Sequence, residues 1–315
     1  MDNSDNNKSA WNEPFFKERT IGKCVSDGIS LISNRFWKII KLALPVIALA
    51  ALCITAVTFV FCNAELEISV SENAVLYGLM FFVLLIPLTS LTAFAYRCVD
   101  VYKERLNIFS IGYKYIYNKE FGKKTLVAFI IFGIAAAGIV CISLFSSSLI
   151  NLFSVDDSFQ QQHYGISPVS LIVFTFFAIL FIIFYVPLIM ALNVMMINNN
   201  QIWSDFKNGY QLGWKKWGRL FALDVMINVI IIVMAVFLLA PAYVISIMQH
   251  SATLSRLQGD AVDIPGYFSI ITLLILFFSS VLCTVIFITK VLPHALFYAN
   301  VVCEDKQDDN NNVEK

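Results

Sequence analysis

The chain has 315 residues, of which 58% are hydrophobic and only 14% are charged, and it contains 28 Phe. This composition is far more apolar than that of a soluble domain, so it excludes a soluble protein and predicts one that lies in a bilayer. Lys and Arg number 22, as do Asp and Glu, and this balance excludes any argument from net charge for a nucleic-acid partner.

The first residues of the chain are polar and read MDNSDNNKSAWNEP. They contain no short apolar core followed by a small-residue cleavage site, so they predict no cleaved signal peptide. We expect residues 1–24 to form a polar cytoplasmic tail in front of a membrane domain.

Six apolar runs follow, and each is long enough to cross a bilayer as a helix, which takes about 20 residues. They lie at 42–62, 74–97, 125–150, 168–197, 219–247 and 267–300. The sequence therefore predicts an all-α integral membrane protein whose domain of six transmembrane helices covers 25–302. The end of the chain reads EDKQDDNNNVEK, and we expect 303–315 to be a disordered cytoplasmic tail.

Basic residues collect in alternate connections between these runs. Seven lie before the first run, seven in 97–124 and four in 207–219, whereas the loops 63–73, 151–167 and 249–266 together hold only Arg256. Because cytoplasmic segments retain Lys and Arg, this distribution predicts that both termini are cytoplasmic. We expect a multi-pass protein of the plasma (inner) membrane of a prokaryote.

A similar phrase precedes each odd-numbered run: CVSDGISLISNRFWKIIKL from residue 24, IFSIGYKYIYNKEFGKKTL from 108 and DFKNGYQLGWKKWGRLF from 205. Each even-numbered run places a proline near its cytoplasmic end, at Pro87, Pro187 and Pro293. Such prolines kink a membrane helix where neighbouring groups can satisfy the freed carbonyl. The pattern predicts three helical-hairpin repeats, each with a cytoplasmic interfacial helix.

The third interfacial segment carries aromatic residues at steps of three or four: Trp203, Phe206, Tyr210, Trp214 and Trp217. This spacing predicts an amphipathic helix with a broad aromatic face, opposite Asp205, in the cytoplasmic headgroup region. Two roles are open for the aromatic face. We prefer an anchor for the start of the next span, and the alternative is a lipid-sensing or partner-docking surface.

The three helical pairs, the proline of each even-numbered span and the approach sequence WKKWGR at 214–219 resemble a group of poorly characterised bacterial membrane proteins. These are multi-span proteins related to the membrane domain of glycerophosphodiester phosphodiesterases. The resemblance covers about 25–302. It implies a membrane module without phosphodiesterase activity, because the catalytic barrel of that group is a separate soluble domain for which this chain has no room. It carries over no catalytic residue.

Four polar residues lie inside the last two spans. Asp224 and Asn228 share one face of the fifth span, and Lys290 and His294 share one face of the sixth, because each pair is four residues apart. An ionisable group in a span costs roughly 2.5–3.5 kcal/mol and therefore finds a partner or a wet cavity. We expect a cytoplasm-facing polar pocket for a ligand or ion pathway, with Asp224 paired with Lys290 or His294. Two structural alternatives stay open, which are snorkelling of Lys290 and an ion pair that only fixes helix packing.

The sequence contains no HExxH, GxSxG, Walker loop, GxGxxG or paired CxxC motif. We therefore predict a non-enzymatic protein with no catalytic residue, no metal and no cofactor. Its predicted function is that of a membrane-embedded binding or accessory module that handles a lipid or small solute. The alternative is a secondary transporter or channel subunit that uses the same four polar residues. The expected partners are the lipid bilayer and either a membrane protein or a second copy of the chain, and not nucleic acid.

Overall fold

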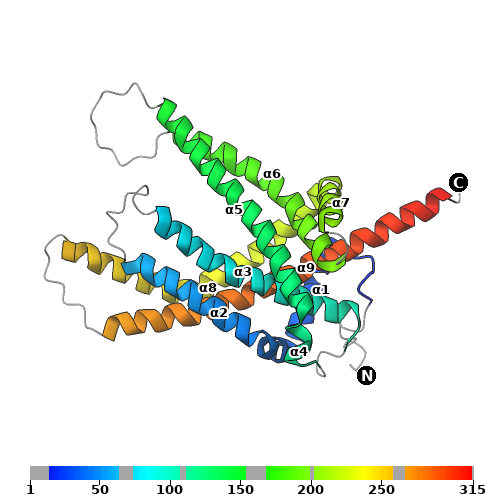
Figure 1. Ribbon diagram of the computed structural model, residues 1–315, viewed down its shortest axis with the longest axis horizontal. Helices are drawn as coiled ribbons and strands as arrows, with labels where there is room; N and C mark the ends of the chain where they lie inside the picture. Colours follow the sequence, from blue (N-terminus) through cyan, green and yellow to red (C-terminus); the bar gives the residue numbers. More distant parts are fainter. Residues whose placement is uncertain are drawn as a thin grey trace, which may run out of the picture. The chain divides into compact units, whose positions relative to one another are not determined.

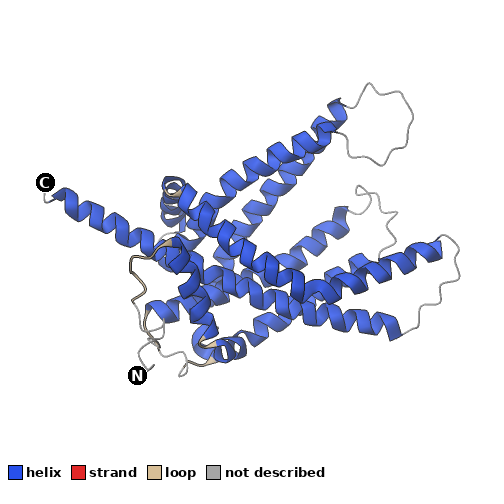
Figure 2. Cartoon of the chain, turned by 180° about the vertical axis from the view of Figure 1, so that it is seen from behind, coloured by secondary structure: helices blue, strands red, loops and turns tan. Residues whose placement is uncertain are grey.

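The computed structural model describes residues 14–63, 74–106, 111–153, 168–198, 202–257 and 267–313. In these segments the chain forms helices joined by turns and loops, and it forms no strand (Figures 1 and 2). The prediction of an all-α protein is confirmed. The described helices are α1 (Ile21–Ser33), α2 (Phe36–Asn63), α3 (Ala74–Lys103), α4 (Tyr113–Ile116), α5 (Lys119–Phe153), α6 (Pro168–Asn198), α7 (Ile202–Lys215), α8 (Trp217–Leu257) and α9 (Tyr267–Val313).

Five of the described helices hold a segment long and apolar enough to cross a membrane. These segments are Phe36–Phe59 of α2, Met80–Lys103 of α3, Thr175–Asn198 of α6, Trp217–Met248 of α8 and Tyr267–Asp305 of α9. A helix satisfies its own backbone polar groups, which is what the hydrocarbon region requires. The prediction of a membrane-embedded protein is therefore confirmed. The predicted third span, 125–150, lies inside the helix α5, and its crossing of the membrane stays a prediction.

The chain forms two compact units. The first unit comprises 1–128 and 222–315, and the second comprises 129–221. In the first unit α2 packs along α9 and α3, and both α1 and α3 also contact α9. The segment 291–301 of α9 is buried throughout its length, so this part of α9 forms the centre of the first unit. In the second unit α7 packs along α6.

Glycines allow the short helices α1 and α7 to lie directly on the prolines of α9 and α6. A Cβ atom at Gly28 of α1 would lie 2.6 Å from Cγ of Pro293 in α9. In the second unit, a Cβ atom at Gly213 of α7 would lie 2.7 Å from Cα of Pro187 in α6. Atoms do not approach this closely without a shift of the backbone, so both contacts require the absence of a side chain.

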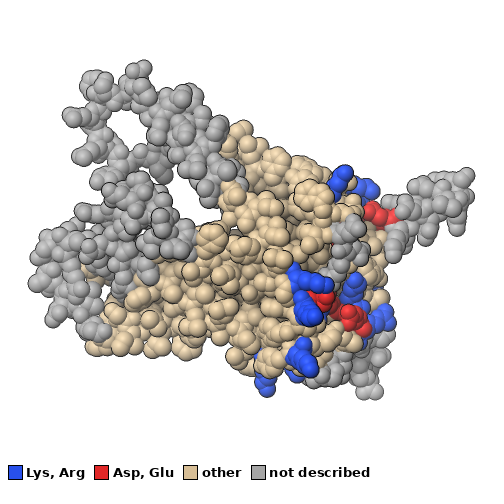
Figure 3. All heavy atoms as spheres, in the orientation of Figure 1, with Lys and Arg blue, Asp and Glu red and all other residues tan. Residues whose placement is uncertain are grey.

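Charged side chains gather at one end of the first unit. On the face shown in Figure 3 they lie around α1 and α4, whereas the described parts of the long helices show no charged side chain along their flanks on this face. An uncharged flank of this kind suits contact with hydrocarbon, because a charge placed there would lose its hydration.

The start of the chain is more ordered than the predicted polar tail. The described part begins at residue 14, and Phe15 and Arg19 are buried in the first unit. The backbone N–H of Arg19 donates to Asn300 Oδ1 at 2.6 Å, and its guanidinium donates to the Phe15 carbonyl oxygen at 2.9 Å and to Asp27 Oδ2 at 3.1 Å. These bonds fix 14–19 in front of α1, so residues 14–24 belong with the folded unit and not with a tail.

The end of the chain also differs from the predicted disordered tail. Helix α9 continues through Val313 and so covers most of 303–315. The segment contains no Pro or Gly to end the helix. In addition, Asn300 Nδ2 donates to Glu304 Oε1 at 3.1 Å, a pairing of residues four apart that supports helix beyond the span.

Candidate functional site

Prolines inside α6 and α9 each remove one backbone donor within the helix. Proline has no N–H, so Pro187 leaves the Ile183 carbonyl without its helical donor. The indole Nε1–H of Trp217 donates to that oxygen at 3.1 Å. Beside Pro293 in α9, His294 Nδ1 lies 2.8 Å from the carbonyl oxygen of Lys290. The indole of Trp217 thus satisfies a backbone group for which lipid offers no partner.

Four side chains of α8 and α9 form one cluster in the first unit. Lys290 Nζ donates to Asn228 Oδ1 at 2.9 Å, and Asn228 Nδ2 donates to Asp224 Oδ2 at 2.7 Å. Asp224 Oδ1 lies 3.2 Å from Lys290 Nζ, which closes a ring, and 3.2 Å from His294 Nε2. The structure therefore brings together the four residues that the sequence analysis selected.

The two ring nitrogens of His294 face groups of different kinds. Nδ1 faces the Lys290 carbonyl oxygen, which only accepts, so Nδ1 carries a hydrogen. Nε2 faces Asp224 Oδ1, and both of these buried atoms lack a hydrogen bond of good geometry among the described residues. A neutral ring with its hydrogen on Nδ1 would set a lone pair against the carboxylate oxygen. A second hydrogen, on Nε2, would remove this repulsion and would give the charged form of the ring.

The cluster can carry two different net charges. With a neutral imidazole, Lys290 and Asp224 compensate each other, whereas a second proton on His294 leaves one net positive charge. The exposed fraction of the side chain is 4% for His294, 11% for Asp224 and 23% for Lys290. Lys290 is therefore the ionic member that a solute reaches first, and its ammonium group sits on a flexible four-carbon stem.

A cavity of about 300 Å³ lies between α2, α8 and α9 of the same unit. Its polar lining consists of hydroxyl and thiol groups, from Thr58, Tyr243, Ser246, Ser279, Ser280 and Cys283. The hydroxyl groups of Thr58, Ser246 and Ser280 donate to carbonyl oxygens four residues earlier at 2.7–2.8 Å. Their oxygens therefore keep lone pairs for other donors, and Ser280 Oγ already accepts from Thr55 Oγ1 at 3.3 Å. Ser280 precedes Lys290 by ten residues, about 15 Å along α9. Sequence reasoning missed this cavity because isolated Ser and Thr residues give no periodic signal.

Helix α7 has the predicted amphipathic character, but the face that contacts α6 is not the aromatic one. Asp205, Gly209 and Gly213 are buried, whereas Trp203 is 78% exposed. The sequence analysis placed Asp205 opposite the aromatic face, and the contact with α6 forms on the side of Asp205 because glycines allow closer helix contact than aromatic rings do. The aromatic residues flank the contact as a row, since Trp203, Phe206, Tyr210 and Trp214 have successive ring centroids 5.8–6.3 Å apart.

A second buried ionic cluster joins α3, α4 and the start of α5, and sequence reasoning did not identify it. Asp100 lies 2.7 Å from Arg97 Nη1 and 3.0 Å from Lys124 Nζ through its two carboxylate oxygens. Arg97 also donates to the Tyr115 carbonyl oxygen at 3.0 Å and lies over the Tyr115 ring. Burial lowers the pKa of Lys124, and Asp100 opposes this effect. Each residue contacts another element, so the cluster connects helices.

Comparisons of the chain with protein-family models, with curated proteins and with solved structures find no match. The chemistry of the cluster formed by Asp224, Asn228, Lys290 and His294 is therefore the basis for a function.

Proposed function

We propose that the chain is a non-enzymatic membrane module that binds a small anionic solute from the cytoplasmic side. The binding residues are Asp224, Asn228, Lys290 and His294. The observation that carries the proposal is the position of Asp224 Oδ1, which lies 3.2 Å from both Lys290 Nζ and His294 Nε2. One carboxylate faces two basic nitrogen atoms. When His294 is protonated, the positive charges outnumber the negative one, and the cluster can bind a second negative group.

Charge balance gives the order of events. Protonation of His294 at Nε2 leaves the cluster with one excess positive charge, which is costly inside a span. An anion that pairs with Lys290 restores neutrality, while Asp224 keeps its contact with His294. Lys290 exchanges Asn228 for the solute, because its side chain is flexible and is more exposed than those of Asp224 and His294. An ion pair that served packing alone would need one cation and not two.

The same proposal includes the membrane topology. We propose that α5 is the third of six spans, that the spans form three hairpins, and that both termini lie in the cytoplasm of a prokaryote. The 35-residue length of α5 supports its membership among the spans, which brings their number from five to six. The glycine-to-proline contacts of α1 and α7 support a repeated unit. The prolines and the sequence WKKWGR support a relation to the membrane modules of glycerophosphodiester phosphodiesterases.

A secondary transporter or channel subunit is the second candidate, and one observation favours it. The hydroxyl-lined cavity of about 300 Å³ lies on the same helices α8 and α9 as the ionic cluster. In a transporter, the solute would bind first at one of these two sites, the cavity and the ionic cluster, and then at the other. Flux in proteoliposomes distinguishes the candidates: a transporter moves a labelled anion across the bilayer, whereas a binding module retains the anion without moving it.

Native mass spectrometry in mild detergent tests the binding site. The purified protein is mixed with inorganic phosphate, with small carboxylates and with organic phosphates, each in turn. We expect an anion adduct on the wild type and its loss in Lys290→Met. Lys41→Met is the matched control, because it removes one positive charge at an exposed position of α2. Equal adducts in all three proteins, or no adduct on the wild type, would contradict the proposal.

A further inference from the structure

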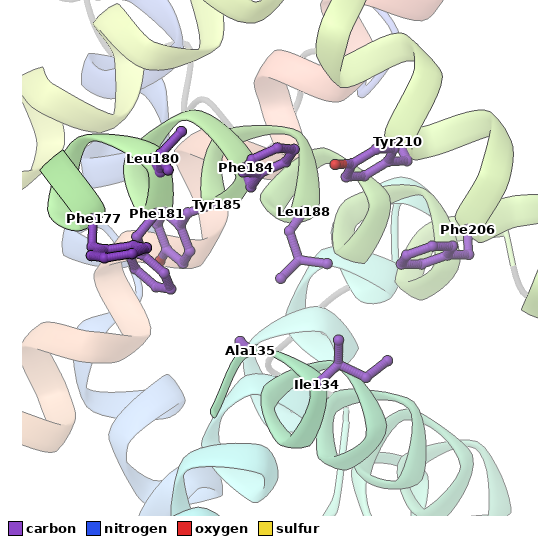
Figure 4. Close-up of a pocket in the computed structure, with 10 residues that line it drawn as sticks. All are labelled: Ile134, Ala135, Phe177, Leu180, Phe181, Phe184, Tyr185, Leu188, Phe206 and Tyr210. Atoms are coloured by element: carbon purple, nitrogen blue, oxygen red, sulfur yellow. The ribbon is translucent and has the colours of Figure 1, made fainter. Parts of the chain in front are cut away.

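The second unit holds a groove of about 560 Å³ between α5, α6 and α7 (Figure 4). This volume is within the range of roughly 300–1,000 Å³ that ligand pockets occupy. Phe177, Phe181 and Leu188 of α6 and Phe206 of α7 contribute to its lining, and Ile134 and Ala135 of α5 face them across the open space. The hydroxyl groups of Tyr185 and Tyr210 are the only polar side-chain groups among its lining residues.

The groove has the length of one lipid chain in one leaflet. Its lining on α6 runs from Phe177 to Leu188, which is about 16 Å of helix. Half of the hydrocarbon core of a bilayer is about 15 Å thick. The groove lies on the membrane-spanning segment Thr175–Asn198 and ends at Phe206 and Tyr210 of the amphipathic helix α7.

The protein leaves this groove unfilled. Ile134 is 53% exposed and Phe184 is 55% exposed although both line it. A space with so apolar a lining does not hold ordered water, because water needs two or more polar partners. The occupant must therefore be apolar along most of its length.

We propose that the groove binds one acyl chain of an anionic phospholipid from the leaflet in which α7 lies. The phosphate would meet Tyr210 and the exposed Lys207, which precedes it by three residues and so neighbours it on the helix surface. Cationic side chains at the headgroup level attract anionic lipid. This site belongs to the second unit and goes beyond the solute site of the first unit, so neither proposal depends on the other.

Titration with one lipid tests the groove. Delipidated protein in detergent is mixed with 1-palmitoyl-2-oleoyl phosphatidylglycerol, and bound lipids are counted by native mass spectrometry. Leu188→Trp and Ala135→Phe fill the groove from α6 and from α5. Ile182→Trp adds the same bulk as Leu188→Trp at an exposed position of α6 outside the groove. We expect the wild type and Ile182→Trp to hold one lipid at concentrations at which both filled variants hold at least tenfold less.

Equal lipid occupancy in the four proteins, or no retained lipid on the wild type, would overturn the proposal. A crosslinking experiment on the wild type needs no variant to fold. Phosphatidylglycerol with a diazirine in its acyl chain should label peptides of 177–188 and 206–210 well above the exposed apolar face of α8 around Phe237. Labelling of α8 equal to that of the groove would also overturn the proposal.

Discussion

At the level of single residues, Asp224 is the carboxylate that compensates the positive charge of Lys290 inside the spans of the first unit. It contacts Lys290 and His294 and accepts a hydrogen bond from Asn228. Removing one member of a buried ion pair leaves the other charge without compensation, whereas removing both members is often nearly neutral. The cluster should therefore show strong energetic coupling between its members.

A double-mutant cycle measures this coupling. Asp224→Asn and Lys290→Met should each lower the free energy of unfolding by about 2 kcal/mol, less than a fully buried pair because Lys290 is partly exposed. The double variant should lose only about 1 kcal/mol, a coupling of about 3 kcal/mol. Unfolding is followed by heating in detergent, with the folded fraction measured by size exclusion. Losses that simply add would show that the two side chains do not act as a pair.

At the level of the elements, Pro187 of α6 explains the position of one polar side-chain group, the indole N–H of Trp217. Pro187 would leave the Ile183 carbonyl orphaned, and Trp217 supplies the missing donor. Trp217 thus has a second role besides that of the predicted interfacial anchor. In α9 the carbonyl that Pro293 leaves without its helical donor is that of Thr289, whereas the His294 ring contacts the carbonyl oxygen of the next residue, Lys290.

The role of Trp217 predicts the effect of one substitution. Trp217→Phe keeps most of the ring but leaves the Ile183 oxygen without a donor, so we expect a loss of stability of about 1–3 kcal/mol. Trp214→Phe, at an exposed ring of the same aromatic row, should change stability by less than about 0.5 kcal/mol. Melting temperatures in detergent provide the comparison. Equal shifts for the two variants would mean that the indole hydrogen bond contributes nothing.

The glycines of α7 and α8 provide a second test, with effects of opposite sign. Gly213→Ala would place a Cβ atom 2.7 Å from Pro187 Cα, so it should destabilise the second unit by about 1–3 kcal/mol. Gly218→Ala meets no atom within 4 Å and should stabilise helix α8 by up to about 1 kcal/mol. Thermal unfolding of both variants checks the pair. A neutral or stabilising Gly213→Ala would contradict the close packing of α7 on α6.

At the level of the whole molecule, the positive-inside distribution predicts that both chain ends lie on one side of the membrane. A variant that keeps Cys303 as its only cysteine should react in intact cells with a membrane-permeant maleimide and not with an impermeant one. Ser251→Cys in the background without other cysteines is the control for the opposite side, because this position of α8 is exposed. Reaction of Cys303 with the impermeant reagent would reverse the proposed orientation.

Much of this organisation can be predicted from the sequence, because lipid imposes simple rules on length and polarity. The apolar runs located five spanning segments, and four-residue spacing selected the members of the cluster on α8 and α9. Helix ends were less predictable, as α9 shows by continuing through Val313. The contact face of α7 and the groove beside it were not predictable, because they depend on how closely α7 approaches α6 at Gly209 and Gly213. Periodicity alone carries no information about that distance.

The most direct measurement is anion binding by a folded variant that lacks the ion pair between Asp224 and Lys290. It shows whether this pair is a binding site or only a packing contact. The double variant with Asp224→Asn and Lys290→Met has no unpaired charge of this pair and should stay folded, so loss of ligand cannot follow from unfolding. We expect native mass spectra of the wild type to show the anion adduct and those of the folded double variant to show none. Retention of the same adduct by the folded double variant would show that the four polar residues fix helix packing and that the ligand binds elsewhere.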